Sequence, residues 1–547
     1  MNNKTFKNPV IKGCYPDPSI CRVGEYYYMV TSSFYYFPAL PVFRSKDLVN
    51  WEQISNAISR SEQLDFRDCD SSEGLWAATI RYHNNKFYII NTLSVNGRAT
   101  KYNFIVTAED PSKEWSDAVI IEGADGIDPS LYFDDEGRMW YMSNCVPKNL
   151  KYPSHKQIYI CEIDKETFQF IGERKIILDG ALDHSEYTEA PHIYFINNTY
   201  FLITACGGTQ TNHCVNMYKS EKLLGPYIPC PRNPIVTNRN IPIINSLGVA
   251  VVGHGDLVES INGQWHMALL GIRPYEYYVE DYSIYSPRKW IREPDRNKNA
   301  QFNLGREVFI VPIVWDFDGW PLVDNENGMV NLVEKFPELP VARVPFQSRI
   351  DNFDDDLLNM AWCMRRPPKT QIYSLTDRKG YLRLFAKDVK IEHKETPAMI
   401  VRRQQHYKFF AQTVLEFNTN TDGDEAGIVL IQNERYSISI LKQQVDNKSV
   451  VSCVKVVNGH RETIRAVEIV TDKIYLSVVG DVGVYSFYYG KSEFEMNPLA
   501  LEVDGSILST VISDGFIGTY LGMYCYSLKC DSTFADFDWF KYEVIEE

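Results

Sequence analysis

The chain has 547 residues, of which 44% are apolar and 23% are charged, a composition typical of a globular protein with a large core. Its net charge of −15 argues against nucleic acid or an anionic membrane as the partner, because both attract basic surfaces. Aromatic residues make up 13% of the chain, with 35 tyrosines, and this excess favours all-β structure and carbohydrate-binding surfaces.

The first residues, MNNKTFKNPV, lack the charged head and apolar run of a secretory signal, and no stretch approaches about 18 consecutive apolar residues. We therefore expect a cytoplasmic protein that does not enter a membrane. The 12 cysteines form no CxxC pair. In a reducing compartment this pattern favours buried free thiols over disulfides or a zinc site.

A similar segment occurs five times in the first part of the chain. Each copy has a head residue, a small residue or proline, an apolar stretch, a turn and an aromatic-rich strand. The heads are Asp17, Trp76, Asp128, Glu189 and His254. They recur roughly every 60 residues, and a near-regular spacing of this size indicates repeated supersecondary units. Because the strands alternate and helical periodicity is nearly absent, we predict a five-bladed β-propeller over residues 1–335.

The pattern changes after the fifth copy. The segment from 337 to 345 is rich in proline, which indicates a linker. Beyond it, short alternating strands such as YLRLFAKD, AGIVLIQ, YSISILK and IYLSVVG are separated by Gly, Asn and Asp turns. Eight or so strands in about 200 residues predict a β-sandwich, of jelly-roll type, over residues 336–547. The predicted fold class is all-β.

An ordered set of motifs resembles a known family. The set comprises NPVIKGCYPDPSI, SSFYYFP, SKDLVNW, LWAATIRYHNNKFY, DGIDPSLYFDDEGRMWY, TEAPHIY, GHGDLVE, GIRP and LGRE. Together they are similar to glycoside hydrolase family 43, the β-xylosidase and α-L-arabinofuranosidase group. IDNFDDDLLNMAW and ADFDWFKYE resemble the accessory domain of its two-domain β-xylosidases. The resemblance implies a sugar pocket at the axial mouth of the propeller, three catalytic acids, and hydrolysis with inversion.

The resemblance places the general base on Asp17, the general acid on Glu189, and the acid that tunes and orients the proton donor on Asp128. An inverting hydrolase holds its two working carboxyl groups about 6.5 to 9.5 Å apart, and a retaining one about 5 to 5.5 Å. The three acids come from different blades, so only convergence at the propeller axis brings them together. We expect the negative charge of Asp128, together with burial, to raise the pKa of Glu189.

Four further positions carry predictions. The resemblance assigns Arg273 to sugar hydroxyls, with a structural ion pair as the alternative. It makes Trp76 a stacking residue, with core packing as the alternative, and Phe37 a second pocket aromatic. His254 matches a histidine near a water or a calcium ion in the central channel. Imidazole suits such a hard cation poorly, so any metal there would be structural, and the reaction requires no cofactor.

Two departures from the family pattern leave the sugar open. Cys206, Gly207 and Gly208 stand where many relatives have EGG. Cys145 and Val146 stand where xylosidases often carry a pocket tryptophan. The predicted activity is therefore the release of β-D-xylose, α-L-arabinofuranose or both from short oligosaccharides by an exo-acting enzyme.

Two alternatives remain. One is a propeller that binds carbohydrate without catalysis, which would have no need for three acids at blade heads. The other is a retaining fructan or sucrose hydrolase on the related fold, although the NDPNG-like head expected there is absent. The predicted partner is a small oligosaccharide, with no nucleic acid or membrane, and the layout suggests a homo-oligomer, either a dimer or a tetramer.

Overall fold

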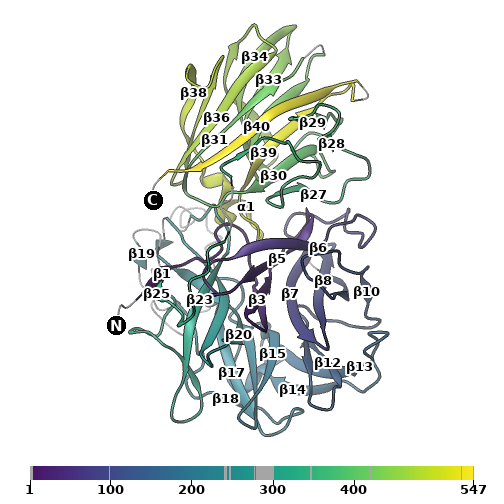
Figure 1. The fold of residues 1–547 in the computed structure, drawn as a ribbon, viewed down its shortest axis with the longest axis vertical. Helices are drawn as coiled ribbons and strands as arrows, with labels where there is room; N and C mark the ends of the chain where they lie inside the picture. Colours follow the sequence, from purple (N-terminus) through teal and green to yellow (C-terminus); the bar gives the residue numbers. More distant parts are fainter. Residues whose placement is uncertain are drawn as a thin grey trace. The chain divides into compact units, whose positions relative to one another are not determined.

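The chain divides into two units in a computed structural model, coloured along the sequence in Figure 1. The structure describes residues 4–97, 99–239, 243–244, 248–275, 277–278, 301–344, 348–418, 421–530 and 532–545. The first unit takes the described residues within Met1–Asn299 and Arg306–Pro345, and the second takes those within Ala300–Gly305 and Phe346–Glu547.

The first unit contains five four-stranded antiparallel sheets, one for each predicted copy. Blade 1 has β2 (Ser19–Val23), β3 (Tyr26–Val30), β5 (Ala39–Ser45) and β6 (Glu52–Ile58). Blade 2 has β7 (Gly74–His83), β8 (Lys86–Val95), β9 (Ala99–Ala108) and β10 (Val119–Ile120). Blade 3 has β11 (Ser130–Phe133), β12 (Met139–Cys145), β13 (Gln157–Ile163) and β14 (Lys175–Asp179). Blade 4 has β15 (Glu189–Ile196), β16 (Thr199–Cys206), β17 (Cys214–Ser220) and β18 (Ile228–Pro229). Blade 5 has β20 (Ala250–Glu259), β21 (Trp265–Ile272), β23 (Glu307–Trp315) and β24 (Pro321–Val323). The predicted five-bladed propeller is confirmed.

Side-chain hydrogen bonds join each inner strand to the next around the axis. They run from Thr79 to the Pro129 carbonyl, from Ser130 to the Pro191 carbonyl, from Tyr194 and Ser19 to Asp256, and from the Ile80 amide to Ser19. Each of the five interfaces between neighbouring blades contains at least one of these hydrogen bonds. The inner strands therefore form a closed ring, which fixes the positions of the head residues that precede or begin them.

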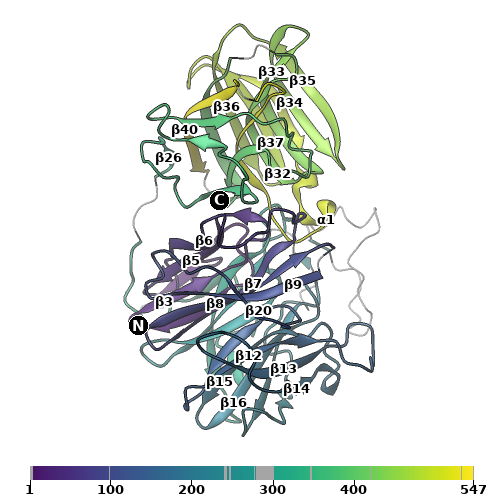
Figure 2. The ribbon, with the colours of Figure 1, turned by 90° about the vertical axis from the view of Figure 1, so that its right-hand side faces the viewer.

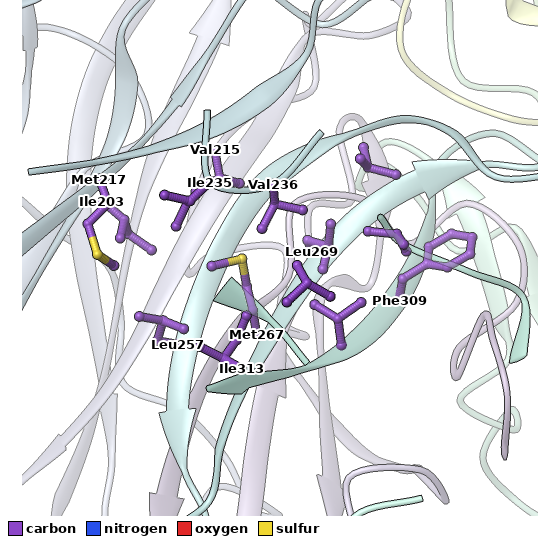
Figure 3. Close-up of a cluster of buried hydrophobic side chains, with 14 of the residues drawn as sticks. Ile203, Val215, Met217, Ile235, Val236, Leu257, Met267, Leu269, Phe309 and Ile313 are labelled. Atoms are coloured by element: carbon purple, nitrogen blue, oxygen red, sulfur yellow. The ribbon is translucent and has the colours of Figure 1, made fainter. Parts of the chain in front are cut away.

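Apolar side chains fill the space between neighbouring blades. Figure 3 shows the cluster between blades 4 and 5, where Ile203 and Met217 of one sheet pack with Leu257, Met267 and Phe309 of the other. All five side chains are buried. At about 25 cal/mol for each Å² of apolar surface removed from water, such clusters supply most of the force that holds the ring closed.

The ends of the propeller unit lie together. β1 (Thr5–Lys7) pairs antiparallel with β25 (Val333–Lys335), and the Val10 amide donates to the Val308 carbonyl at 2.9 Å. Short strands β19 (Ile243–Ile244) and β22 (Tyr277–Tyr278) pair with each other, and β4 spans Tyr36–Phe37.

The proline-rich segment packs on the propeller. Phe336 and Leu339 lie against the core cluster that contains Phe6 and Phe43, and the Ala342 amide donates to Asp47 Oδ2 at 2.8 Å. These contacts place the division between the units after Pro345, ten residues later than the boundary predicted at 335. Alternating patterns reveal strands, but they do not show which unit a proline-rich segment packs on.

The second unit is a sandwich of two antiparallel sheets, drawn in green to yellow in Figure 2. One sheet runs β28 (Tyr373–Ser374), β29 (Leu382–Phe385), β40 (Phe534–Val544), β31 (Lys408–Glu416), β36 (Lys473–Asp481), β37 (Val484–Gly490) and β38 (Met496–Asp504), with β26 (Ile350–Asp351) beside β40. The other runs β35 (His460–Glu468), β34 (Lys448–Val457), β33 (Tyr436–Val445), β32 (Glu425–Asn433), β39 (Tyr520–Tyr526), β30 (Ala398–Arg403) and β27 (Trp362–Arg365). The predicted all-β fold with a C-terminal sandwich is confirmed.

Helices are few in the described parts of the chain. They comprise the four-residue α1 (Thr510–Ser513) and the 3-10 turns η1 (Gly180–Leu182) and η3 (Ser506–Leu508). Within those parts, no helix has the length and apolar character needed to cross a membrane. The 12 cysteines are all free thiols, most of them buried, as predicted.

Candidate active site

The three predicted acids lie at the same end of the inner strands. Asp17 and Asp128 each stand two residues before their strand, β2 and β11, and Glu189 is the first residue of β15. In both DPS heads, the proline after the aspartate lacks an N–H for the sheet, so regular pairing begins only at the serine. The three carboxyl groups consequently converge at one end of the propeller axis.

Backbone strain marks these heads. Asp17 and Asp128 have φ of 56° and 53°, and Ala190 and His254 have φ of 49° and 51°. Non-glycine residues rarely adopt this left-handed region, at a cost of about 1 to 3 kcal/mol each. In blade 4 the register shifts between Glu189 and His192, a bulge that turns Glu189 out of the regular alternation. The ring of hydrogen bonds holds this strain, which aims the acids at the axis.

Glu189 is the acid best prepared to donate a proton. Burial and the negative charge of Asp17 raise its pKa to about 8, and the positive charge of Lys156 opposes the rise. Below that pKa the carboxyl group keeps its proton, so a raised pKa favours the neutral acid form of Glu189 at pH 7.

Asp128 is also driven towards its protonated form. It is more deeply buried than Glu189, and its pKa is raised well above the usual range by burial first, and then by the charges of Glu189 and Asp17. The negative charge that raises the pKa of Glu189 is that of Asp17, whereas the sequence pointed to Asp128. The tuning and orienting role of Asp128 stays a prediction.

Asp17 is placed as a base. Its Oδ2 accepts a hydrogen bond from Ser32 Oγ at 2.5 Å, and its Oδ1 lies 3.6 Å from His254 Nδ1. The carboxylate is 17% exposed, enough to meet a water molecule. Burial lowers the pKa of the nearby Arg306 guanidinium, and the negative charge of Asp17 opposes that fall.

A buried ion pair lies on the axis beside the acids. Arg81 donates to both oxygens of Asp256, at 2.9 and 3.2 Å, and to His192 Nδ1 at 2.8 Å. Because arginine only donates, His192 must accept at Nδ1 and carry its proton on Nε2. Burial would raise the pKa of Asp256, but Arg81 and the neighbouring hydrogen bonds hold it well below its usual range.

These groups do not fit a calcium ion beside His254. Calcium takes about six to eight oxygen ligands, whereas the groups around His254 are a guanidinium, imidazole rings and the two carboxylates of Asp17 and Asp256. Both oxygens of Asp256 already accept hydrogen bonds from Arg81, and Asp17 Oδ2 accepts one from Ser32. Across the described ranges, no group of three or more His, Cys, Asp or Glu side chains could hold a metal. The residues around His254 are therefore a poor match for the structural calcium ion that the family resemblance suggested there.

The other predicted sugar contacts have mixed surroundings. Arg273 forms a buried two-pronged ion pair with Glu307, at 2.7 and 3.0 Å, so the structural alternative is present whether or not the arginine also meets sugar. Trp76 is half-buried and donates to the Ser72 carbonyl at 3.0 Å. Phe37 is only 7% exposed, which leaves little of its ring for stacking. The sugar-binding roles of Arg273, Trp76 and Phe37 stay predictions.

Tyr187 is a residue that the sequence reasoning missed. It stands two positions before Glu189, is 48% exposed, and has a φ of 50°. Its amide donates to the Ser154 carbonyl at 2.9 Å, and its ring lies so close to Gly208 that a Cβ there would meet Cδ2 at 3.2 Å. An aromatic directly before TEAPH was the available signal. Lys156, whose charge acts on Glu189, had no signal in the sequence.

The Cys-Gly-Gly departure has a structural explanation. Gly207 and Gly208 have φ of 81° and 69°, which favours glycine, and a side chain on Gly207 would collide with the Asn212 carbonyl. Cys206 is buried, with its thiol 3.3 Å from Thr204 Oγ1. The left-handed backbone and the nearby Tyr187 ring therefore explain glycine at these two positions. Cys206 stands where the EGG motif would have a negatively charged glutamate. Val146, in the other departure, is 60% exposed.

A closed propeller with three interacting carboxyl groups at one end of its axis, among them a glutamate whose raised pKa favours the neutral acid at pH 7, is the arrangement of a glycoside hydrolase. Comparison with known families agrees. Residues 6–321 match the model of glycosyl hydrolases family 43, and residues 350–543 match that of the beta xylosidase C-terminal concanavalin A-like domain. The chain belongs to glycoside hydrolase family 43.

Several relatives match the whole chain. A xylosidase/arabinosidase of Butyrivibrio fibrisolvens is 33% identical, with 98% of this chain and 99% of that protein covered. The non-reducing end alpha-L-arabinofuranosidase BoGH43B of Bacteroides ovatus is 32% identical, with 100% and 96% covered. The crystal structure of the GH43 protein BlXynB from Bacillus licheniformis superimposes with a TM-score of 0.87 at 31% identity, over 99% of this chain and 100% of that chain.

Proposed function

We propose that the protein is an exo-acting glycosidase that releases a terminal pentose, β-D-xylose, α-L-arabinofuranose or both, from short oligosaccharides with inversion. The observation that carries the proposal is the placement of the buried Glu189, whose pKa burial and Asp17 raise to about 8, beside the partly exposed side chain of Asp17. The names of the relatives, a xylosidase/arabinosidase and an alpha-L-arabinofuranosidase, support the substrate class.

In the proposed reaction, Asp17 takes a proton from a water molecule as that water attacks the anomeric carbon. Glu189 gives its proton to the glycosidic oxygen as the bond between that oxygen and the anomeric carbon breaks. The products are a free pentose of opposite configuration and the shortened chain. Asp128, whose protonated form is favoured by burial and by the charges of Glu189 and Asp17, is proposed to orient the donor. Carboxyl groups perform both proton transfers, so we propose that the reaction needs no cofactor.

A panel of aryl xylosides and arabinofuranosides, followed by NMR of the first-formed anomer, tests this proposal. We expect pentose release, with the inverted anomer appearing before mutarotation. Binding without hydrolysis would favour a carbohydrate-binding propeller. A retained anomer would favour the retaining hydrolase that the sequence left open.

Asp128→Asn is expected to leave the alkaline limb of the pH profile near pH 8. The pKa of Glu189, about 8, is raised by burial and by the charge of Asp17, while burial and neighbouring charges favour the protonated form of Asp128. An amide at 128 therefore replaces a carboxyl group whose neutral form is already favoured, and little charge next to Glu189 is lost. The measurement is kcat/KM against pH on an activated aryl glycoside. A clear downward shift of the limb would show that Asp128 is ionised, as the sequence alone suggested.

Tyr187→Ala is expected to weaken hydrolysis of a disaccharide about tenfold in kcat/KM, the loss of about 1.4 kcal/mol of stacking with the departing sugar. Hydrolysis of the corresponding methyl glycoside should hardly change, because methoxide is a leaving group of similar basicity to a sugar alkoxide but has no sugar ring for Tyr187 to stack on. Tyr187→Phe is the matched control and should retain activity on both substrates. Equal losses on the two substrates would remove Tyr187 from the leaving-group side.

A further inference from the structure

A groove of about 670 Å³ lies between blades 4 and 5, away from the acids. Its lining comes from the turn between β15 and β16, the residues after β17, and the turn between β23 and β24. The residues that matter here are Asn197, Thr199, Lys219, Glu221, Trp315 and Phe317. The groove begins at Ile196, the last residue of β15, whereas Glu189 is the first. One strand of this length separates them by roughly 23 Å.

Phe317 is held out at the rim of this groove. Its side chain is 98% exposed, although a phenylalanine gains most from burial. The turn that carries it is rigid: Arg232 pairs with Asp318 at 2.6 and 3.1 Å and lies 3.6 Å from Asp316. The Asp316 amide also donates to the Trp320 carbonyl at 2.8 Å. An exposed aromatic ring on a braced turn is thus presented at little cost in conformational entropy.

Trp315 adds a second aromatic ring to the lining of the groove. It packs against Phe201, with ring centroids 4.9 Å apart, and against Trp265 at 5.7 Å. These contacts hold the indole in place. Its Nε1 is buried, so Trp315 meets a ligand through its ring and not through its N–H.

The charges of the groove favour a neutral ligand. Lys219 and Lys222 are balanced by Glu221 and Asp316 along its lining. The remaining polar lining groups include an amide and hydroxyls, which serve as both donors and acceptors. Aromatic rings beside such groups match a sugar, whose C–H faces stack and whose hydroxyls accept and donate.

We propose that this groove is a second binding site, for a neutral oligosaccharide chain, separate from the catalytic acids. Phe317 stacks on a sugar ring, and the Trp315 ring lines the groove beside it. Binding here is independent of hydrolysis. It would keep a chain on the enzyme's surface between turnovers without changing the chemistry at Glu189.

The test uses full-length protein with Asp17→Ala, which prevents turnover, and calorimetric titration with xylohexaose and an arabino-oligosaccharide. We expect two binding events for at least one of these probes. Adding Phe317→Ala should weaken the second event about tenfold or more. Ile261→Ala is the matched control, because Ile261 is a 58% exposed apolar side chain on another blade 5 turn outside the groove.

The outcomes are separable. A single binding event that Phe317→Ala leaves unchanged would overturn the proposal. A second outcome would also overturn it: Phe317→Ala changes the oligomeric state, measured by light scattering, but leaves sugar binding unaltered. The groove would then be a contact between copies of the chain. Hydrolysis of short aryl glycosides by the Phe317→Ala variant of the active enzyme should match wild type. Wild-type hydrolysis itself tests the proposed catalytic function independently of this site.

Discussion

Asp17→Ala is expected to abolish hydrolysis of every substrate, with a loss of at least about 10² to 10⁴ in kcat. Water must be deprotonated whatever the leaving group, so an activated aryl glycoside should fare no better than a disaccharide. The measurement is kcat on both substrates, alongside a thermal unfolding curve that shows whether the variant is folded.

Asp17→Asn is the matched variant for this experiment. Asp17 has a φ of 56°, a conformation that asparagine tolerates better than alanine, and the amide keeps the shape of the side chain without its basicity. Ser32→Ala, which removes the 2.5 Å hydrogen bond to Asp17 Oδ2, should cause a smaller loss. Near-normal turnover by a folded Asp17→Asn protein would remove Asp17 from the role of base.

Glu189→Gln is expected to depress turnover of a disaccharide by about 10² to 10⁴, or roughly 3 to 5 kcal/mol, and turnover of a dinitrophenyl glycoside far less. The sugar alkoxide leaves badly without a proton, whereas dinitrophenolate barely needs one. The measurement is kcat for both substrates in wild type and variant.

The pH profile provides the control for Glu189→Gln. In wild type, activity should fall as pH rises through the pKa of Glu189, about 8, because the acid then loses its proton. In the variant that alkaline limb should vanish on the dinitrophenyl substrate, since no titrating acid remains. Equal losses on both substrates, with the limb retained, would assign the proton donor to another group.

The blade architecture could be predicted because its signals are local. Heads such as Asp17 and Asp128 recur with the same following Pro and Ser, and Gly and Asn turns precede the aromatic-rich strands. A period of two along the strands and a repeat along the chain require no knowledge of distant contacts. The same reasoning found Glu189 at the start of an inner strand, where the structure places it.

The sequence by itself determined the all-β class, the five blades, the C-terminal sandwich and the positions of the three acids at the heads of inner strands, because strand patterns and head motifs lie in neighbouring residues. Only the tertiary structure showed that Asp128 is also driven towards its protonated form, since its burial and the charges of Glu189 and Asp17 that act on it depend on other blades. It also revealed Tyr187 above Gly208 and the Arg273 ion pair with Glu307, contacts between residues far apart or on different loops. Protonation and packing depend on distances through space, which folding sets and local pattern does not contain.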